Sequence, residues 1–338
     1  MRLYDKLKKP KFLLKGVATY LPRHFRRYLP QHQPQFLGEG VRNERIDIKD
    51  AARACYTVWL RFLVRLGEQN DFSLSSIHAI GEIGPGDNIG IGFCGLLSGA
   101  SSYVAFDVVP TGFNHANHEI LEELICLFQD RAPIPDEKEF PRCFPRLTSY
   151  KFPAHILTED VLRFSLQPER LKKIRQALGA ISRGDGVEGE ITISYTLPWL
   201  EKKPSEDSID LILSNAALEH VDDLPGTYRA STQLVRKGGW GAHTIGLDCH
   251  GTSSLWNGHW TYGDLFWHIL RGNSAYLINR TPVSGHVHLL EQEHFRVVEK
   301  DCYKRTNELS RDDLAAQFRG LGDEDLKTHS AFLLVMKE

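Results

Sequence analysis

The chain has 338 residues, of which 41% are hydrophobic and 25% are charged. This composition is typical of a globular protein with one large domain or two domains. Because 41 basic and 43 acidic residues nearly cancel, net charge gives no sign of a nucleic-acid partner, and we expect none. No apolar run reaches the roughly 18 residues that a membrane span needs. The six cysteines are scattered without a CxxC pair, which predicts reduced thiols and a cytoplasmic protein.

The first 27 residues are strongly basic, with nine Lys or Arg and a single acid, Asp5. Apolar and basic residues are mixed between Pro10 and Pro30. This pattern fits a helix on an anionic membrane surface, which would make the protein peripheral at the inner membrane, or a solvated basic arm. Pro22 interrupts the helix and favours the arm.

A helix is predicted over residues 47–69, where apolar side chains recur at helical spacing. Asp47 or Asp50 can cap its start. We assign this helix to an N-terminal basic and helical extension, residues 1–76, and place the main domain at residues 77–338.

The main domain opens with a strand, a glycine-rich turn, a helix and a second strand. The strands are predicted at 76–83 and 102–109. The helix between them spans 87–99, with Asp87 or Asn88 as its cap. Strand, helix and strand in this order form a βαβ unit, which predicts a parallel sheet.

Residues 112–186 interrupt this alternation with two helical stretches around a proline-rich loop, and we predict a helical insertion that caps the carboxyl edge of the sheet. A helix at 224–239 is predicted to end at two glycines, and 251–295 is predicted to be a substrate-facing loop and helix region. Five more strands are predicted, at 190–197, 208–215, 240–247, 293–303 and 329–337. The predicted fold is therefore α/β, with a seven-stranded, mostly parallel sheet.

The stretch "GEIGPGDNIGIGF" stands where the first strand turns into its helix, the place where open parallel sheets bind ligands. A dinucleotide loop has the spacing GxGxxG, but Gly90 comes one residue late after Gly84 and Gly86. The carboxylates of Glu82 and Asp87 would repel the negative charge of a pyrophosphate. Two carboxylates suit a cationic ligand without phosphate, such as S-adenosylmethionine.

The motif "EIGPGD" resembles the first motif of class I S-adenosylmethionine-dependent methyltransferases, an acid followed by GxG. "SIDLILSNAALEHV" resembles the fourth-strand motif of that family, and "LVRKGGWGAHTI" resembles the helix, turn and fifth strand that follow. The resemblance covers residues 77–247 apart from the insertion. It implies a Rossmann-like methyltransferase domain, a methyltransferase activity and S-adenosyl-L-methionine as the cofactor.

The resemblance also implies which residues bind the cofactor. Asp107 ends the second strand, where the acid of the family takes both ribose hydroxyls. Asn215 opens the segment that lines the methionine side, and Tyr195 or Thr196 stands where adenine is cradled. Each of the three acids has a structural alternative, Asp87 as a helix cap, Glu82 in ordering the loop and Asp107 as a turn residue at the strand end. The predicted cofactor-binding residues are Glu82, Gly84, Gly86, Asp87, Asp107, Tyr195, Thr196 and Asn215.

Eight of the fifteen histidines lie between residues 220 and 294, beyond the carboxyl ends of the fourth and fifth strands. A sugar hydroxyl is a poor nucleophile at neutral pH, and a positioned histidine improves it. We predict His250 or His220 as the catalytic base and Asp248 or Glu219 as its orienting acid. Asp248 and His250 would share a side if the strand continued. The alternative is that these histidines are structural hydrogen bonders.

Metal binding is a competing use of this region. His243, Asp248, His250 and His259 together hold enough donors for one divalent ion. Their spacing matches no zinc pattern, and Mg²⁺ prefers carboxylates to imidazoles, so no metal is expected.

Residues 55–63, 242–260 and 277–295 resemble bacterial methyltransferases encoded with surface-polysaccharide genes. That resemblance implies O-methylation of a sugar hydroxyl on a surface glycan or its lipid-linked precursor, which would make polysaccharide biosynthesis the setting. The alternatives are a small-molecule or lipid methyltransferase, a non-catalytic scaffold of this fold and, disfavoured by glycine spacing, a nicotinamide dehydrogenase.

Overall fold

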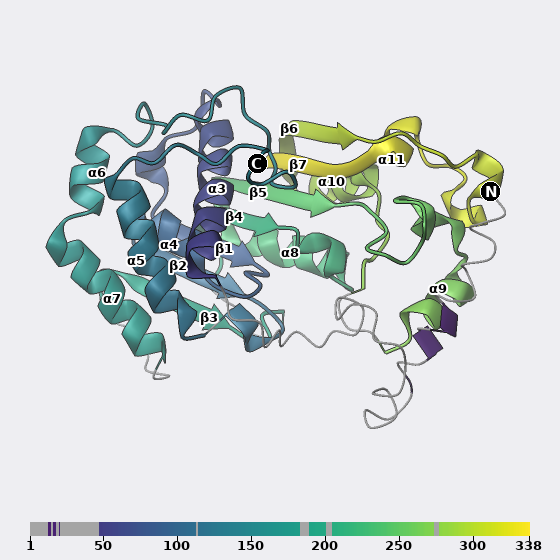
Figure 1. Ribbon diagram of the computed structural model, residues 1–338, viewed down its shortest axis with the longest axis horizontal. Helices are drawn as coiled ribbons and strands as arrows, with labels where there is room; N and C mark the ends of the chain where they lie inside the picture. Colours follow the sequence, from purple (N-terminus) through teal and green to yellow (C-terminus); the bar gives the residue numbers. More distant parts are fainter. Residues whose placement is uncertain are drawn as a thin grey trace.

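The computed structural model describes residues 13–14, 16–17, 20, 47–112, 114–182, 189–200, 205–273 and 277–338. Its centre is one seven-stranded sheet with the order β3-β2-β1-β4-β5-β7-β6 (Figure 1). The first five strands of that order pair in parallel, and β7 runs antiparallel to both of its neighbours. This is the strand order of the class I methyltransferase fold, and it confirms the predicted fold class.

All seven predicted strands are present. Their bounds are β1 Ala79–Ile83, β2 Ser102–Phe106, β3 Thr192–Thr196, β4 Ile209–Asn215, β5 Val235–Gly246, β6 Phe295–Lys304 and β7 Thr328–Lys337. β4 is buried at every residue but its last, as a central strand with both faces covered must be. Its alternate side chains enter different cores, with Leu211 and Leu213 on one side and Ile212 on the other.

The described ranges contain nine longer helices. Their bounds are α3 Ile48–Gly67, α4 Gly90–Leu97, α5 Ala116–Gln129, α6 Glu159–Ser165, α7 Pro168–Ser182, α8 Leu224–Leu234, α9 Asp264–Arg271, α10 Val283–Gln292 and α11 Asp323–Lys327. α3, α4 and α5 share one core with the sheet, and α8 and α10 share the other. None of the helices in these ranges is long and apolar enough to cross a bilayer.

α3 begins as the sequence predicts, with the Asp47 side chain accepting a hydrogen bond from the Asp50 N–H at 3.1 Å. Its Phe62 ring packs on Phe332 of β7, and its Trp59 side chain is also buried. Arg61 is completely buried and donates to backbone carbonyls of the loop that follows α5, among them that of Pro135 at 2.7 Å. α3 therefore shares its core with the main sheet.

The predicted insertion contains α5, α6 and α7 (Figure 1). α5 packs against α3 and α4, and α7 packs against the edge strand β3. Pro168 is the first residue of α7, so the second helical stretch of the prediction is two helices instead of one.

The fifth strand begins earlier than predicted, and α8 ends earlier. The pairing of β4 with β5 jumps from Ile209–Val235 to Leu211–Trp240, which leaves the two glycines in a bulge of the strand. Gly238 there has a φ of +71°, a left-handed conformation that favours glycine. These glycines therefore bend a strand and do not end a helix.

Candidate functional site

The predicted site residues all come from the carboxyl ends of the parallel strands. Because these ends meet at one edge of the sheet, the residues lie along a single rim. β1 and its turn carry Glu82, Gly84, Gly86 and Asp87, and the end of β2 is followed by Asp107. β3 ends with Tyr195 and Thr196, and β4 ends with Asn215. The short helix η4, Leu218–His220, carries Glu219 and His220, and the turn after β5 carries Asp248 and His250.

The glycine turn after β1 uses its two glycines for different purposes. Gly84 and Gly86 have φ values of +66° and +73°, where other residues are strained. A side chain on Gly84 would place its Cβ 2.7 Å from that of Ala217, whereas one on Gly86 would meet nothing within 4 Å. Gly84 thus lets the turn touch the loop after β4, and Gly86 leaves open backbone for a ligand.

Glu82 points into the protein interior. The side chain is almost fully buried, and the Tyr103 hydroxyl donates a hydrogen bond to its Oε2 at 2.5 Å. Burial raises the pKa of Glu82 to about 8, and the hydrogen bond from Tyr103 offsets part of this rise. The Glu82 carboxylate is thus held by a residue of β2, and both its contact with the cofactor and its ordering of the turn stay predictions.

Asp87 is exposed beside the turn, and its side chain does not cap α4. Of the two predicted caps, Asn88 is the one whose side chain accepts the Gly90 N–H, at 2.9 Å. The Asp87 carboxylate is therefore available to a ligand, and its contact with the cofactor stays a prediction.

Asp107 is held at the end of β2 by its neighbours. Its Oδ1 accepts the N–H of Val108 at 2.7 Å, and its Oδ2 accepts the Tyr195 hydroxyl at 3.0 Å. The backbone N–H of Asp107 donates to the Thr196 carbonyl at 3.3 Å. Burial and the Asp107 charge raise the pKa of the Tyr195 hydroxyl well above its usual value. Tyr195 therefore remains a hydrogen-bond donor that fixes this carboxylate.

Sequence reasoning missed the residues that brace the glycine turn. Asn117 of α5 is buried, its Oδ1 accepts the Ile89 N–H at 3.1 Å, and its Nδ2 donates to the Gly112 carbonyl at 2.9 Å. The Thr111 hydroxyl donates to the Gly86 carbonyl at 3.1 Å. A signal for Asn117 exists in the sequence, because it falls at helical spacing on the apolar face of α5.

The turn after β4 is fixed by side chains from distant segments. Asn215 accepts the Thr244 hydroxyl of β5 at 2.6 Å. The Asn279 side chain donates to the carbonyls of Leu218 and Val221, at 2.7 and 3.0 Å, and its backbone N–H donates to that of Glu219 at 2.7 Å. Asn279 was not predicted as a site residue, and no local pattern marks it.

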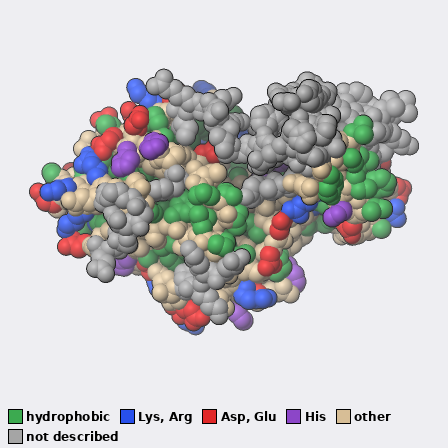
Figure 2. Space-filling view, turned by 90° about the horizontal axis from the view of Figure 1, so that it is seen from below, with side chains coloured by type: hydrophobic (Ala, Val, Ile, Leu, Met, Phe, Trp, Pro, Cys, Tyr) green, Lys and Arg blue, Asp and Glu red, His purple; other side chains and the backbone are tan. Residues whose placement is uncertain are grey.

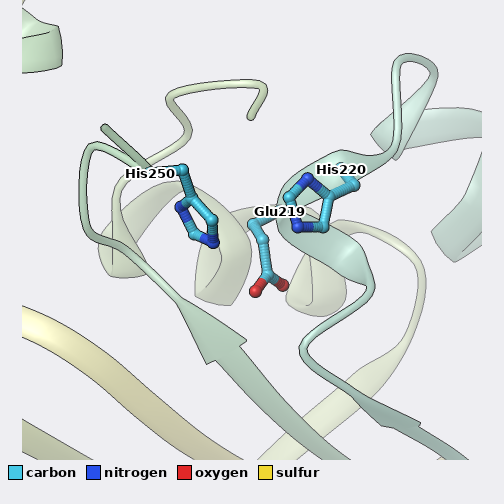
Figure 3. Close-up of side chains that lie close together, drawn as sticks. All are labelled: Glu219, His220 and His250. Carbon is cyan, nitrogen blue, oxygen red and sulfur yellow. The ribbon is translucent and has the colours of Figure 1, made fainter. Parts of the chain in front are cut away.

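Glu219, His220 and His250 come together beside this turn (Figure 3). One donor atom from each lies within 4.8 Å of those of the other two. The rings of His220 and His250 are edge to face, with centroids 5.0 Å apart. Glu219 is 2% exposed, and its Oε1 accepts the Gly246 N–H at 3.0 Å. Burial raises the pKa of Glu219 to about 7.

Asp248 contacts His250, and its role as the orienting acid of a catalytic base stays a prediction. The His250 Nδ1 lies 3.0 Å from Asp248 Oδ1, and the His250 backbone N–H donates to the same oxygen at 2.9 Å. β5 ends at Gly246, so the pair is made by a turn in which His250 has a φ of +44°, and not by strand parity. Burial opposes both charges, but their mutual attraction prevails, lowering the pKa of Asp248 to about 2 and raising that of His250.

The other histidines of the predicted metal set lie in the core. His243 is buried with its Nδ1 2.9 Å from the Ser214 hydroxyl, and burial lowers its pKa to about 4. His259 is buried against Trp260, and burial lowers its pKa to about 3. Within the described ranges, three metal-donor side chains meet only at Glu219, His220 and His250.

The chain is similar to known proteins in structure but not in sequence. No protein-family model matches the sequence, and no curated protein matches it.

Similar solved structures include an S-adenosylmethionine-dependent methyltransferase from Mesorhizobium loti, 13% identical with a TM-score of 0.38, covering 81% of this chain and 96% of that one. A methyltransferase of Methanosarcina mazei is 10% identical with a TM-score of 0.40, covering 78% and 93%. An N-methyltransferase of Haemonchus contortus, in complex with phosphomonomethylethanolamine and S-adenosylhomocysteine, is 12% identical with a TM-score of 0.39, covering 82% and 52%. The class I methyltransferase fold of this chain follows from its own strand order.

Proposed function

We propose that this protein is a methyltransferase that uses S-adenosyl-L-methionine. The observation that carries the proposal is the pairing of two neighbouring strand ends. An open glycine turn at Gly84 and Gly86 follows β1, and a fixed carboxylate, Asp107, follows β2. Backbone approach at the turn and two acceptor oxygens for a ribose fit an adenosyl ligand that carries no phosphate.

The reaction that fits the site is methyl transfer to an oxygen. A lone pair of the acceptor oxygen forms the new O–CH₃ bond, and the C–S⁺ bond breaks with its electrons passing to sulfur. The acceptor proton leaves to solvent, and S-adenosylhomocysteine is released. The cofactor supplies the reactive methyl group, and the protein supplies alignment and activation of the oxygen. We place that activation at Glu219, His220, Asp248 and His250, because they gather beside the turn that touches Gly84.

For the acceptor, we propose a sugar hydroxyl on a bacterial surface glycan or its lipid-linked precursor. The resemblance of residues 242–260 and 277–295 to polysaccharide-linked methyltransferases supports this choice. Of the tryptophans in that region, Trp260 and Trp267 are buried core residues, whereas Trp256 is half-buried and donates its Nε1–H to the Thr306 carbonyl at 2.9 Å. Trp256 is therefore the one we assign to a sugar face.

We further propose that the end of the molecule that carries α9 docks on an anionic membrane surface. Hydrophobic side chains gather at that end in Figure 2, and the exposed ones there are Leu14, Val17, Leu265 and Phe266. Leu13 packs on the cluster that contains Trp267 of α9, which ties the two segments together. The nine basic residues among the first 27 lie outside the described residues, and their number in the sequence is the reason for choosing an anionic surface.

Vesicle sedimentation tests the membrane proposal. Vesicles of phosphatidylcholine with phosphatidylglycerol should carry the protein down, and phosphatidylcholine alone should not. Leu265→Ser with Phe266→Ser should weaken this binding. Equal sedimentation with both vesicle types, or no effect of the double substitution, would count against the proposed surface.

The cofactor proposal is tested by titration calorimetry with S-adenosylmethionine, S-adenosylhomocysteine and NAD. We expect micromolar binding of both sulfur compounds and none of NAD. If neither sulfur compound binds, the scaffold alternative replaces the enzyme. If S-adenosylhomocysteine forms only with small-molecule acceptors and never with glycans, the sugar assignment is wrong.

A further inference from the structure

Glu219 has an oxygen that the protein itself leaves without a partner. Its Oε1 accepts the Gly246 N–H, but its Oε2 is buried and makes no hydrogen bond among the described residues. An unpaired buried carboxylate oxygen costs free energy unless a ligand satisfies it. A cation is the natural partner of such an oxygen.

Two imidazole rings flank the Glu219 side chain (Figure 3). His220 stands next to Glu219 on η4, and His250 comes from the turn after β5. The donors lie within 4.8 Å of one another, and no hydrogen bond or ion pair joins Glu219 to His250 in the described ranges. An ion about 2.0–2.2 Å from each donor requires the donor atoms to lie at most about 4.4 Å apart, so binding would draw the three side chains together.

The surroundings of the three donors are those of a metal site. The Nδ1 of His250 is held by Asp248 at 3.0 Å, which leaves Nε2 for a ligand. Metal-binding histidines commonly give their second nitrogen to a carboxylate in this way. A Cβ on Gly246 would lie 2.6 Å from Glu219 Oε1 and 3.4 Å from His250, so this glycine makes room for the Glu219 carboxylate beside His250. His250 has a φ of +44°, a strained conformation of the kind that is common at functional sites.

We propose that Glu219, His220 and His250 bind one divalent cation, with Asp248 as the residue that positions His250. Two imidazoles and one carboxylate favour zinc or a transition-metal ion over Mg²⁺. His250 is exposed and His220 is half-buried, so the ion would keep an open side toward the rim. Sequence reasoning expected no metal, because it considered a different set of residues whose spacing matches no zinc pattern.

The inference deepens the proposed function, on which its catalytic meaning rests. The open side of the ion is where the acceptor hydroxyl would bind. A bound cation makes a hydroxyl more acidic, so the oxygen becomes a better nucleophile toward the methyl group. The histidines would then act through the ion and not as the base.

Cobalt binding tests the site directly. The full chain, stripped of metal by dialysis against a chelator, is titrated with Co²⁺ and followed by its visible absorption, with Zn²⁺ as the competitor. We expect one Co²⁺ per chain, displaced by Zn²⁺. Glu219→Gln and His250→Ala should each weaken binding at least tenfold, and Asp248→Asn by about tenfold or more. His118→Ala, an exposed histidine of α5, is the matched control and should bind as the wild type does.

Folding of every variant is checked by circular dichroism and by S-adenosylhomocysteine affinity. Glu219→Gln keeps an acceptor for Gly246, so it guards against simple unfolding. Absence of saturable Co²⁺ binding, or equal binding in wild type and in both ligand variants, would overturn the metal site. Cofactor binding without metal binding refutes this inference alone, and metal binding without cofactor binding refutes the proposed function alone.

Discussion

The two halves of the candidate site differ in how completely their polar groups are paired. At the ends of β1 and β2, Glu82 accepts from Tyr103, and both oxygens of Asp107 accept hydrogen bonds. At the ends of β4 and β5, a buried oxygen of Glu219 has no hydrogen-bond partner within the described ranges. The polar groups of the first half are thus paired by the protein itself, whereas under our proposal a bound cation pairs the open oxygen of the second.

This difference predicts separable effects, and substitution of His250 should give the largest. Activation of the acceptor oxygen is typically worth 10²- to 10⁴-fold in rate. We expect His250→Ala to lower turnover by about 100-fold or more while S-adenosylhomocysteine affinity changes less than about twofold. Release of S-adenosylhomocysteine with a glycan acceptor measures the rate. A full rate in both His250→Ala and His220→Ala would remove these residues from the chemistry.

Asp107→Ala should do the reverse. It removes the predicted bidentate contact with the ribose, which we take as worth about 1.5–3 kcal/mol in total with a charged acceptor. We expect S-adenosylhomocysteine affinity to fall by about 30-fold, with turnover at saturating cofactor less affected. Titration calorimetry measures the affinity, and Asp71→Ala, at an exposed acid outside the site, is the matched control. An unchanged affinity in Asp107→Ala would place the ribose elsewhere.

Glu82, at the end of β1, should make the free energy of unfolding of the protein depend on pH. Burial raises its pKa from 4.5 to about 8 in the folded protein, so the folded state holds a proton that the unfolded state releases. The stability that this provides is fully present below about pH 4.5 and is lost as pH rises through about 8. Glu82→Gln should flatten this part of the dependence, measured by urea unfolding from pH 5 to 9. The same slope in both proteins would show that Glu82 is ionised when folded.

Asn117→Ala should give the smallest of these effects. It leaves the Ile89 N–H and the Gly112 carbonyl without their side-chain partner. We expect a loss of about 1–3 kcal/mol in the free energy of unfolding, with weaker cofactor binding because the glycine turn loosens. Asn114→Ala, at a less buried neighbour, should cost less. If cofactor affinity falls no further in Asn117→Ala than in Asn114→Ala, the turn does not depend on this brace.

The sequence predicted the architecture because its signals are local. Apolar runs, helical spacing and the glycines of the first turn identified all seven strands and their order of appearance. The start of β5 was missed, since a bulge with glycines looks like a helix end when only the adjacent residues are read. The pairing of Asp248 with His250 was predicted, although by strand parity and not by the turn that makes it.

What the amino-acid sequence determined by itself is the parallel sheet and the residues that stand at its carboxyl ends, because both follow from patterns a few residues long. Only the tertiary structure decided how those residues are used. Asn279 holds the turn that carries Glu219, although it lies about 60 positions away in the sequence, and Asn117 braces the glycine turn from 28 positions away. Gly246 leaves room for the Glu219 carboxylate, which comes from the end of another strand. Whether a buried oxygen keeps a partner depends on such distant contacts, so the unpaired oxygen of Glu219 becomes visible only in the folded chain.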